Sequence, residues 1–300
     1  MWFKNASFLR LPEGFQLDVT GLEEAVAARG LRSPGPLELE TRGFVSPFAR
    51  DDAALTLSSS GAVLLALGHE GRLLPSSVVK DAVAERAREH EAKTGRKPGK
   101  RLRNEFKEAA LAELLPRAFV RKSRTPYFLD SESGLMVVDS SSDKQLESCA
   151  SELREALGSF AVRPLSANAS LPFLMSQWLQ TGELPEGFEL GDECELKDPS
   201  DSASSVRCRR HDLSAEEVRE HVRCGKQVSQ LGLVYEQRIG FVLDAKLKLR
   251  KIKFLDLVQE SLDQGADQDP DQLLAASFAL MSLELRRLLA RLRVVLEFVD

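Results

Sequence analysis

The stretch that decides the fold is Pro126-Tyr127-Phe128-Leu129-Asp130-Ser131-Glu132-Ser133-Gly134-Leu135-Met136-Val137-Val138. Two apolar runs flank a polar turn that ends in glycine, which predicts an antiparallel hairpin with strands at 126–129 and 135–138. A helix should follow, because Ser142 and Gln145 form a capping-box pattern and an apolar face then continues as far as Gly158. A hairpin followed by an amphipathic helix indicates an α+β fold.

The same mixture of elements recurs on both sides of this stretch. We expect strands at 2–11, 43–45, 62–67, 188–196, 205–210, 226–234, 237–243 and 247–254, and helices at 76–90 and 101–115. Proline and glycine breaks place a boundary near 165–185. We therefore predict mixed helices and antiparallel sheets in two regions: 1–165, which includes a basic helical tip at about 76–125, and 166–300, which ends in a long helix.

That last helix has the most regular pattern in the chain. Asp269-Pro270 predicts its start, with proline in the first turn. Its apolar residues repeat every seven positions: Leu274, Phe278, Met281, Leu285, Leu288, Leu292, Val295 and Val299. A dimer seam and packing against the helix's own domain both fit this repeat, and we favour packing within the chain.

Composition and cysteine content narrow the class of protein. The chain has 300 residues, of which 43% are hydrophobic and 29% charged, as in ordinary soluble globular proteins. No apolar run approaches the length of a membrane span, and no signal-peptide pattern opens the sequence. Four cysteines are few and fit a reducing compartment. We expect a cytoplasmic protein without a membrane partner.

Charge is distributed unevenly along the chain. The net charge is −5, yet residues 93–124 contain eleven basic and three acidic residues, so the remainder of the chain is strongly acidic. A second basic run spans 246–254, where the alternation slips at Arg250-Lys251 and predicts a strand with a bulge. Such runs are often only solvated surface. Two of them on an acidic chain favour local attraction of a polyanion.

Sequence motifs for catalysis and for nucleotide binding are absent. There is no phosphate-binding glycine loop, no dinucleotide fingerprint and no nucleophile elbow. The basic residues follow no recognition-helix or zinc-finger pattern, which favours contact with phosphates over reading of bases. We predict no catalytic residue, no metal and no cofactor.

Two constellations suggest other chemistry. Cys208, His211, His221 and Cys224 have the residue types of a tetrahedral zinc site, although ordinary packing explains them equally simply. A metal-dependent nuclease would need clustered carboxylates, for which the candidates are Asp130, Glu132, Asp139 and Asp143. These four carboxylates flank a turn and a helix start, where acidic residues are common.

Several segments together resemble a known family. They are Met1-Trp2-Phe3-Lys4-Asn5, Leu73-Leu74-Pro75-Ser76-Ser77-Val78-Val79-Lys80, Leu114-Leu115-Pro116-Arg117-Ala118-Phe119, Gly134-Leu135-Met136-Val137-Val138-Asp139, Leu157-Gly158-Ser159 with Pro164-Leu165-Ser166, and Gln237-Arg238-Ile239-Gly240-Phe241-Val242. Each is weak alone, but their order and spacing over essentially the whole chain are specific. The sequence resembles the RdgC family of recombination-associated proteins.

The resemblance implies a fold, a function and an assembly. It implies an α+β protein that forms a closed, ring-shaped homodimer around DNA, with a positively charged central hole. Such a protein binds double- and single-stranded DNA with little sequence preference. It is associated with the nucleoid and negatively modulates strand exchange promoted by a RecA-type recombinase. The resemblance implies no enzymatic activity.

The candidate site residues follow from charge and from the resemblance. The basic runs suggest as DNA-binding residues Lys97, Lys100, Arg101, Arg117, Arg121, Lys122, Arg124, Lys248 and Lys251. The resemblance places the dimer interface at Phe119, on a tip, and at Arg210, His211 and Lys226. The Arg210-His211 pair stands where the family has lysine followed by glutamine. Two other functions stay open: a metal-dependent nuclease using Asp130 and Asp139, and a protein-binding scaffold without DNA affinity.

Overall fold

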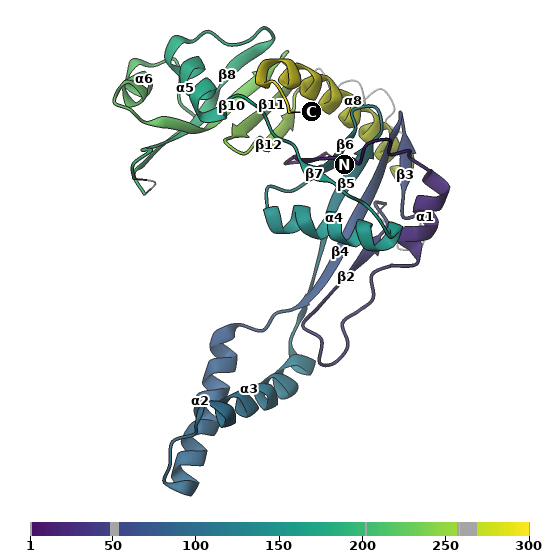
Figure 1. Ribbon diagram of the computed structural model, residues 1–300, viewed down its shortest axis with the longest axis vertical. Helices are drawn as coiled ribbons and strands as arrows, with labels where there is room; N and C mark the ends of the chain where they lie inside the picture. The colour runs from purple at the N-terminus through teal and green to yellow at the C-terminus, as the bar shows by residue number, and fades with distance from the viewer. Residues whose placement is uncertain (1, 49–53, 202, 257, 259–268, 300) are drawn as a thin grey trace. The chain divides into compact units, whose positions relative to one another are not determined.

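The computed structural model describes residues 2–48, 54–201, 203–256, 258 and 269–299 (Figure 1). The chain forms two compact units. Unit 1 contains Met1–Ala28, Ser46–Ala66 and Thr125–Asp300, and unit 2 contains Arg29–Val45 and Leu67–Arg124. The predicted division at residue 165 falls within unit 1, and most of the predicted basic tip falls within unit 2. The division into regions 1–165 and 166–300 stays a prediction.

The predicted hairpin is confirmed. Strands β5 (Val120–Asp130) and β6 (Leu135–Val138) pair antiparallel, with Tyr127 opposite Val138. Gly134 closes the turn at φ 68°, a left-handed conformation that favours glycine. Helix α4 (Asp143–Leu157) follows and ends at Gly158 as predicted. The predicted capping box is wrong, because the Ser142 side chain makes no capping hydrogen bond and the Ser140 hydroxyl donates to Gln145.

The hairpin lies in the middle of the first sheet. Its other strands are β1 (Ser7–Arg10), β2 (Glu40–Val45), β3 (Leu57–Ser59), β4 (Ala62–Arg72) and β7 (Arg163–Pro164). The order is β2-β4-β5-β6-β1-β7, with β3 beside β4. Helix α1 (Val19–Ala27) begins at the N-cap Asp18, whose side chain accepts the Gly21 N–H. Strands β4 and β5 contribute residues to both units.

The second sheet belongs wholly to unit 1. It contains β8 (Phe188–Lys197), β9 (Ser205–Arg209), β10 (Gln227–Tyr235), β11 (Ile239–Asp244) and β12 (Leu249–Phe254), in the order β12-β11-β10-β8-β9. Gly240 faces Lys253 while Val242 faces Arg250, so β12 holds one extra residue and the predicted bulge is confirmed. Helices α5 (Leu171–Thr181) and α6 (Glu216–Arg223) share the buried cluster of this sheet.

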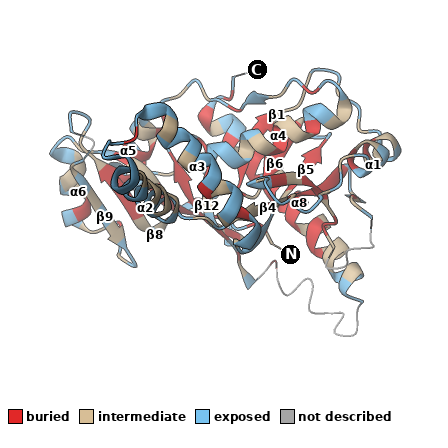
Figure 2. Ribbon diagram, turned by 90° about the horizontal axis from the view of Figure 1, so that it is seen from below, coloured by how far each residue is buried: buried red, intermediate tan, exposed pale blue. Residues whose placement is uncertain are grey.

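Helix α8 (Pro270–Leu296) provides much of the core of unit 1. Its heptad residues Phe278, Met281, Leu285, Leu288 and Leu292 are buried, so this part of the repeat packs within the chain. The prediction was wrong for Val299, which lies beyond the end of the helix at Leu296 and is 39% exposed. Figure 2 shows the burial of each element. The centre of the Phe128 ring in β5 lies 5.7 Å from that of Phe278 and 5.6 Å from that of Phe3. Among the described residues, no helix combines the length and apolarity that crossing a bilayer would require.

A buried ion pair joins α8 to the hairpin. Asp130 is 2% exposed, and the Arg286 guanidinium donates to both of its carboxylate oxygens, at 3.0 and 2.9 Å. The same guanidinium binds Glu132 and the Ser60 carbonyl. A bidentate pair of this kind fixes orientation as well as distance. It therefore sets where α8 lies relative to the turn between β5 and β6.

We expect Leu288→Ala to lower the free energy of unfolding by about 2–5 kcal/mol, because it would open a cavity in a packed core. Leu283 lies on the same helix but is 42% exposed, so Leu283→Ala is the matched control and should cost much less. Denaturant titration of both variants measures the difference. A lower solution mass for Leu288→Ala than for the unaltered chain, without loss of stability, would instead indicate a seam between two chains.

Candidate nucleic-acid interface

Two helices and a short turn carry the basic segment of unit 2. They are α2 (Ser76–Thr94), α3 (Lys100–Leu114) and the 3-10 turn Leu115–Arg117. Helix α2 ends at Gly95, whose φ of 69° permits the reversal. The helices touch through an ion pair between Arg86 and Glu113, at 2.7 Å, and through the rings of His90 and Phe106. Helix α2 has no buried residue and α3 has only Ala110, so both are largely exposed (Figure 2).

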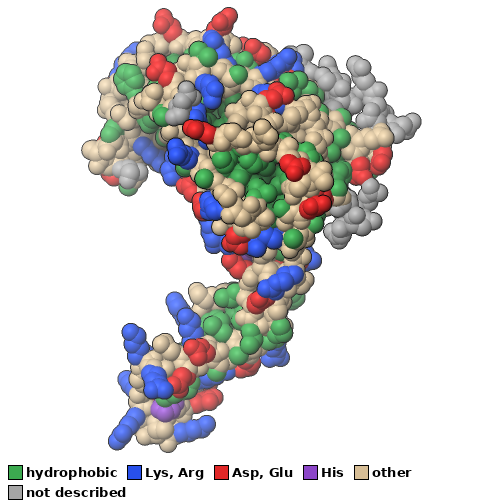
Figure 3. Space-filling model, turned by 45° about the vertical axis from the view of Figure 1, so that its right-hand side comes forward, with side chains coloured by type: hydrophobic (Ala, Val, Ile, Leu, Met, Phe, Trp, Pro, Cys, Tyr) green, Lys and Arg blue, Asp and Glu red, His purple; other side chains and the backbone are tan. Residues whose placement is uncertain are grey.

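The predicted cations of this segment are all exposed. They are Lys97, Lys100, Arg101, Arg117, Arg121, Lys122 and Arg124, and Figure 3 shows basic side chains spread around this part of unit 2. Arg101 is 3.3 Å from Glu105, and Lys122 is 2.8 Å from Glu70. Lys97, Lys100, Arg117 and Arg121 form no ion pair with a carboxylate within the described part of the chain. Their charges are therefore available to an external anion.

The first residues of strand β5 belong to the exposed basic segment of unit 2. Its first five residues are exposed and its last four are buried, so the strand changes its surroundings halfway along its length. The Lys122 ammonium reaches Glu70, which is 5% exposed, and the hydrogen bond between them lowers the pKa of Glu70 although burial acts against this. Glu70 thus stays ionised and ties Lys122 to β4, while the lysine side chain itself remains 75% exposed.

Arg72 anchors the base of the basic segment. Its guanidinium donates to the Leu115 carbonyl at 2.7 Å, to the Glu38 carbonyl at 3.2 Å and to the Gly35 carbonyl at 3.2 Å. The Leu73 N–H then donates to the Phe119 carbonyl at 2.8 Å. The end of β4, the loop that precedes β2 and the end of α3 are therefore held by one half-buried side chain. Sequence analysis missed Arg72, because the carbonyls it binds have no sequence signature.

The same unit exposes apolar side chains. Phe119 is 83% exposed, so it is not a core residue of the chain. Leu37, Leu39, Leu73 and Val120 are also between 40% and 64% exposed. A groove of about 740 Å³ lies between the helices and is lined by Leu39, Leu74, Ser76, Val79, Lys80, Val83, Ala84, Ala87, Arg103, Lys107 and Leu111. Sequence analysis missed this groove, although Val79, Val83 and Ala87 recur at four-residue spacing.

The other two predicted DNA-binding lysines lie in unit 1. The Lys248 side chain is only 8% exposed, and its ammonium binds Asp143 and the Ser141 carbonyl. The Lys251 ammonium binds Glu193. Both positive charges are thus met by carboxylates of the chain itself. A DNA-binding role for either lysine stays a prediction.

The predicted interface residues Arg210, His211 and Lys226 also lie in unit 1. Arg210 follows β9 at φ 51° and is exposed. The His211 Nε2 atom is 3.3 Å from Glu217, and Lys226 donates to the Ser204 hydroxyl at 3.2 Å. The dimer contact assigned to these residues stays a prediction.

The carboxylates proposed for a nuclease are engaged elsewhere. Asp130 and Glu132 bind Arg286. Asp139 accepts the N–H groups of Lys4 and Asn5, at 3.0 and 2.8 Å, and burial raises the pKa of its carboxyl group. Hydrogen bonds from Lys248 and Lys246 lower the pKa of Asp143. Each carboxylate thus has a structural partner.

The residues suggested for zinc are not assembled into a site. Within the described residues, no three His, Cys, Asp or Glu side chains are grouped so that they could hold a metal ion. Cys208 in β9 instead lies directly opposite Cys194 in the neighbouring strand β8. The Cys224 thiol donates to Glu220 at 3.7 Å.

Replacing Arg72 with methionine should free the backbone that it holds. We expect faster amide hydrogen exchange at residues 34–38 and 115–119, and a stability loss of about 1–3 kcal/mol from carbonyls left without their donor. Hydrogen-exchange mass spectrometry measures the first effect. Arg32→Met, which removes an exposed arginine paired with Glu38, is the control and should leave residues 115–119 unchanged. Equal exchange in the two variants would contradict the anchoring role.

The chain can be compared with known proteins. Residues 1–298 match the family model described as "Putative exonuclease, RdgC". The chain is 40% identical over 298 residues to the "Recombination-associated protein RdgC" of Xanthomonas axonopodis pv. citri (strain 306), a match that covers 99% of this chain and 98% of that protein. The protein of that name from Xylella fastidiosa (strain 9a5c) is also 40% identical, with the same coverage. A match of this length and identity shows that the chain belongs to the RdgC family of recombination-associated proteins.

Proposed function

We propose that this protein binds double- and single-stranded DNA without sequence preference, as a homodimer that encircles the DNA. We further propose that it restrains strand exchange promoted by a RecA-type recombinase, as a cytoplasmic, nucleoid-associated protein. The observation that carries the proposal is the set of exposed cations in unit 2, four of which form no ion pair with a carboxylate in the described chain. The recombination-associated name of the relatives supports the choice of DNA as the polyanion.

The arrangement of these cations suits phosphate contact. They lie on α3, on the 3-10 turn, on the first residues of β5 and in the loop before α3, so no single helix presents them to a groove. Lysine and arginine contacts to phosphates add affinity that depends on salt and hardly on sequence. Because the remainder of the chain is acidic, attraction is confined to this surface and the rest repels DNA.

The homodimer would use two contacts for each subunit. A ring of two copies closes only if two separate surfaces each meet their symmetry mate. Phe119, with the apolar groove of unit 2, supplies one surface, and burying this side chain would contribute about 1.5–3 kcal/mol. Arg210, His211 and Lys226 in unit 1 supply the other. We propose that a second copy of this chain covers the groove, because the exposed apolar side chains and the groove occur together in one unit.

We propose binding rather than catalysis. The carboxylates nearest to a nuclease pattern are held by Arg286, by backbone N–H groups or by lysines. Plasmid incubated with the protein and Mg²⁺ or Mn²⁺ should therefore stay supercoiled on a gel, at the level of a protein-free control. Nicking that is lost in Asp139→Asn but kept in Glu147→Gln, an exposed glutamate on α4, would instead establish the nuclease.

Binding to random-sequence DNA should weaken with salt. If about six phosphates are neutralised, log K should fall against log salt with a slope of about −5. The double variant Lys100→Gln/Arg121→Gln should reduce the magnitude of that slope by about 2. Lys144→Gln/Arg163→Gln removes one exposed lysine and one exposed arginine of unit 1 and is the matched control. Equal slopes for both variants would contradict the assignment of Lys100 and Arg121 to phosphate contact. No binding to DNA at low salt would favour a protein-binding scaffold without DNA affinity.

Phe119→Ala should weaken dimerisation without unfolding the chain. The side chain is 83% exposed, so its removal leaves no cavity in the monomer. Analytical ultracentrifugation should show a shift toward monomer, with an unchanged circular dichroism spectrum. Phe173→Ala on α5 is the matched control, because Phe173 is 63% exposed and lies in unit 1. A dimer unaffected by Phe119→Ala would remove this residue from the interface.

A further inference from the structure

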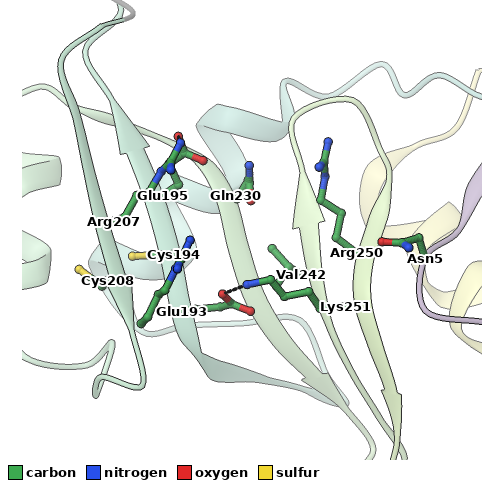
Figure 4. Close-up of a pocket in the computed structure, with 11 residues that line it drawn as sticks. Asn5, Glu193, Cys194, Glu195, Arg207, Cys208, Gln230, Val242, Arg250 and Lys251 are labelled. Carbon is green, nitrogen blue, oxygen red and sulfur yellow. Dashed lines mark hydrogen bonds and ion pairs between the residues drawn. The ribbon is translucent and has the colours of Figure 1, made fainter. Parts of the chain in front are cut away.

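Two cysteines face each other across neighbouring strands of the second sheet. Cys194 in β8 is the direct antiparallel partner of Cys208 in β9, so both side chains lie on the same face of the sheet. Figure 4 shows their sulfur atoms side by side. Opposed residues of antiparallel strands have Cα atoms about 4.5 or 5.5 Å apart. Both values lie within the range of about 4.4–6.8 Å that disulfides span. The backbone therefore already has the spacing of a disulfide, while both thiols are free.

The two thiols differ in access. Cys194 is 4% exposed and belongs to the buried cluster, whereas Cys208 is half-buried. Among the described strands, β9 pairs only with β8, so Cys208 lies on an edge strand of the sheet. Burial and the neighbouring Cys208 raise the pKa of Cys194 to about 12, which keeps its thiol protonated at neutral pH. A small reagent would therefore meet Cys208 first.

The two other cysteines lack this geometry. Cys149 is fully buried in α4, away from any reagent. Cys224 is exposed at the end of α6, where its thiol donates to Glu220. Only Cys194 and Cys208 are cross-strand partners in the described chain. Intramolecular oxidation should therefore select this pair, although Cys224 is the most exposed thiol.

We propose that Cys194 and Cys208 form a reversible redox site that reacts with small-molecule disulfides such as oxidised glutathione. The Cys208 thiolate attacks one sulfur of the reagent, a mixed disulfide forms, and the first glutathione leaves as a thiolate that takes up the proton lost by Cys208. The Cys194 thiol then attacks the Cys208 sulfur and the bond between Cys208 and glutathione breaks, so that the second glutathione leaves as a thiolate and takes up the proton lost by Cys194. Two protein thiols are oxidised to one disulfide, and one glutathione disulfide is reduced to two thiols.

The cross-link would change the edge of the sheet. It closes the chain between residues 194 and 208 and fixes β9 to β8 by a covalent bond in addition to the strand hydrogen bonds. Arg210 and His211 follow β9 directly, so the bond would restrict the segment that carries them. The neighbouring cross-strand pair, Glu195 and Arg207, forms an ion pair at 3.1 Å, and this pair and both cysteines line a pocket of about 340 Å³. The redox state of the two sulfurs would thus act on the lining of this pocket.

Mass spectrometry of the full-length protein tests this site. Reduced protein is incubated with excess oxidised glutathione, free thiols are blocked with N-ethylmaleimide, and the chain is cut with chymotrypsin. We expect a disulfide between peptides 191–196 and 197–213, the loss of the Cys194 and Cys208 thiols, and recovery of both with dithiothreitol. Because the mapping uses the natural sequence, it does not depend on the folding of any variant.

Two variants serve as matched controls. Cys224→Ser removes the most exposed thiol and should leave the cross-link intact. Cys208→Ser should abolish the cross-link and leave Cys194 resistant to blocking in the folded protein. A cross-link to Cys224, a disulfide between two chains, or a stable glutathione adduct on Cys208 without closure would each overturn the proposal.

Discussion

The guanidinium of Arg72 is the interaction on which the cationic surface depends. Helix α2 buries no residue, so its position is set by its contacts with α3 and by what holds its N-terminal end. Arg72 precedes α2 by four residues and binds the carbonyl of Leu115, just beyond α3. The planar fork of an arginine can reach several carbonyls at once, whereas a lysine ammonium is a single point of charge. Most helical stability in proteins comes from packing of an apolar face, and α2 buries no residue, which makes such an external anchor important.

The local parts of the fold were predictable from the sequence. The hairpin at 126–138, the end of α4 at Gly158 and the bulge in β12 are each encoded within a dozen residues, by periodicity and by turn chemistry. The opening strand was predicted too long, at 2–11 instead of Ser7–Arg10. Apolar residues such as Phe3 continue the strand pattern, although that side chain contributes to the core before β1 begins.

The candidate site was predictable only in part. Charge alone identified the exposed cations of residues 93–124, because a dense basic run cannot be buried. It could not separate Lys248 from them, since the carboxylate that binds Lys248 belongs to Asp143, more than a hundred positions earlier. The pairing of Asp130 with Arg286 was missed for the same reason, because its two residues are also far apart in the sequence. Long-range ion pairs leave no trace in local sequence patterns, so the charges they neutralise look free until the fold is known.

Unit 2 has a consequence for the order in which the protein is made. All of its residues have been synthesised by Arg124, whereas unit 1 still lacks β6, the second sheet and α8 at that point. Strand β1 leaves the ribosome early but must wait for β6 and β7, its partners in the sheet. A strand with open edges attracts other chains, and non-local pairing is slow. The nascent chain thus carries a complete cationic sequence while its first strand is still unpaired, and an unpaired strand of this kind is prone to aggregation until β6 and β7 have been made.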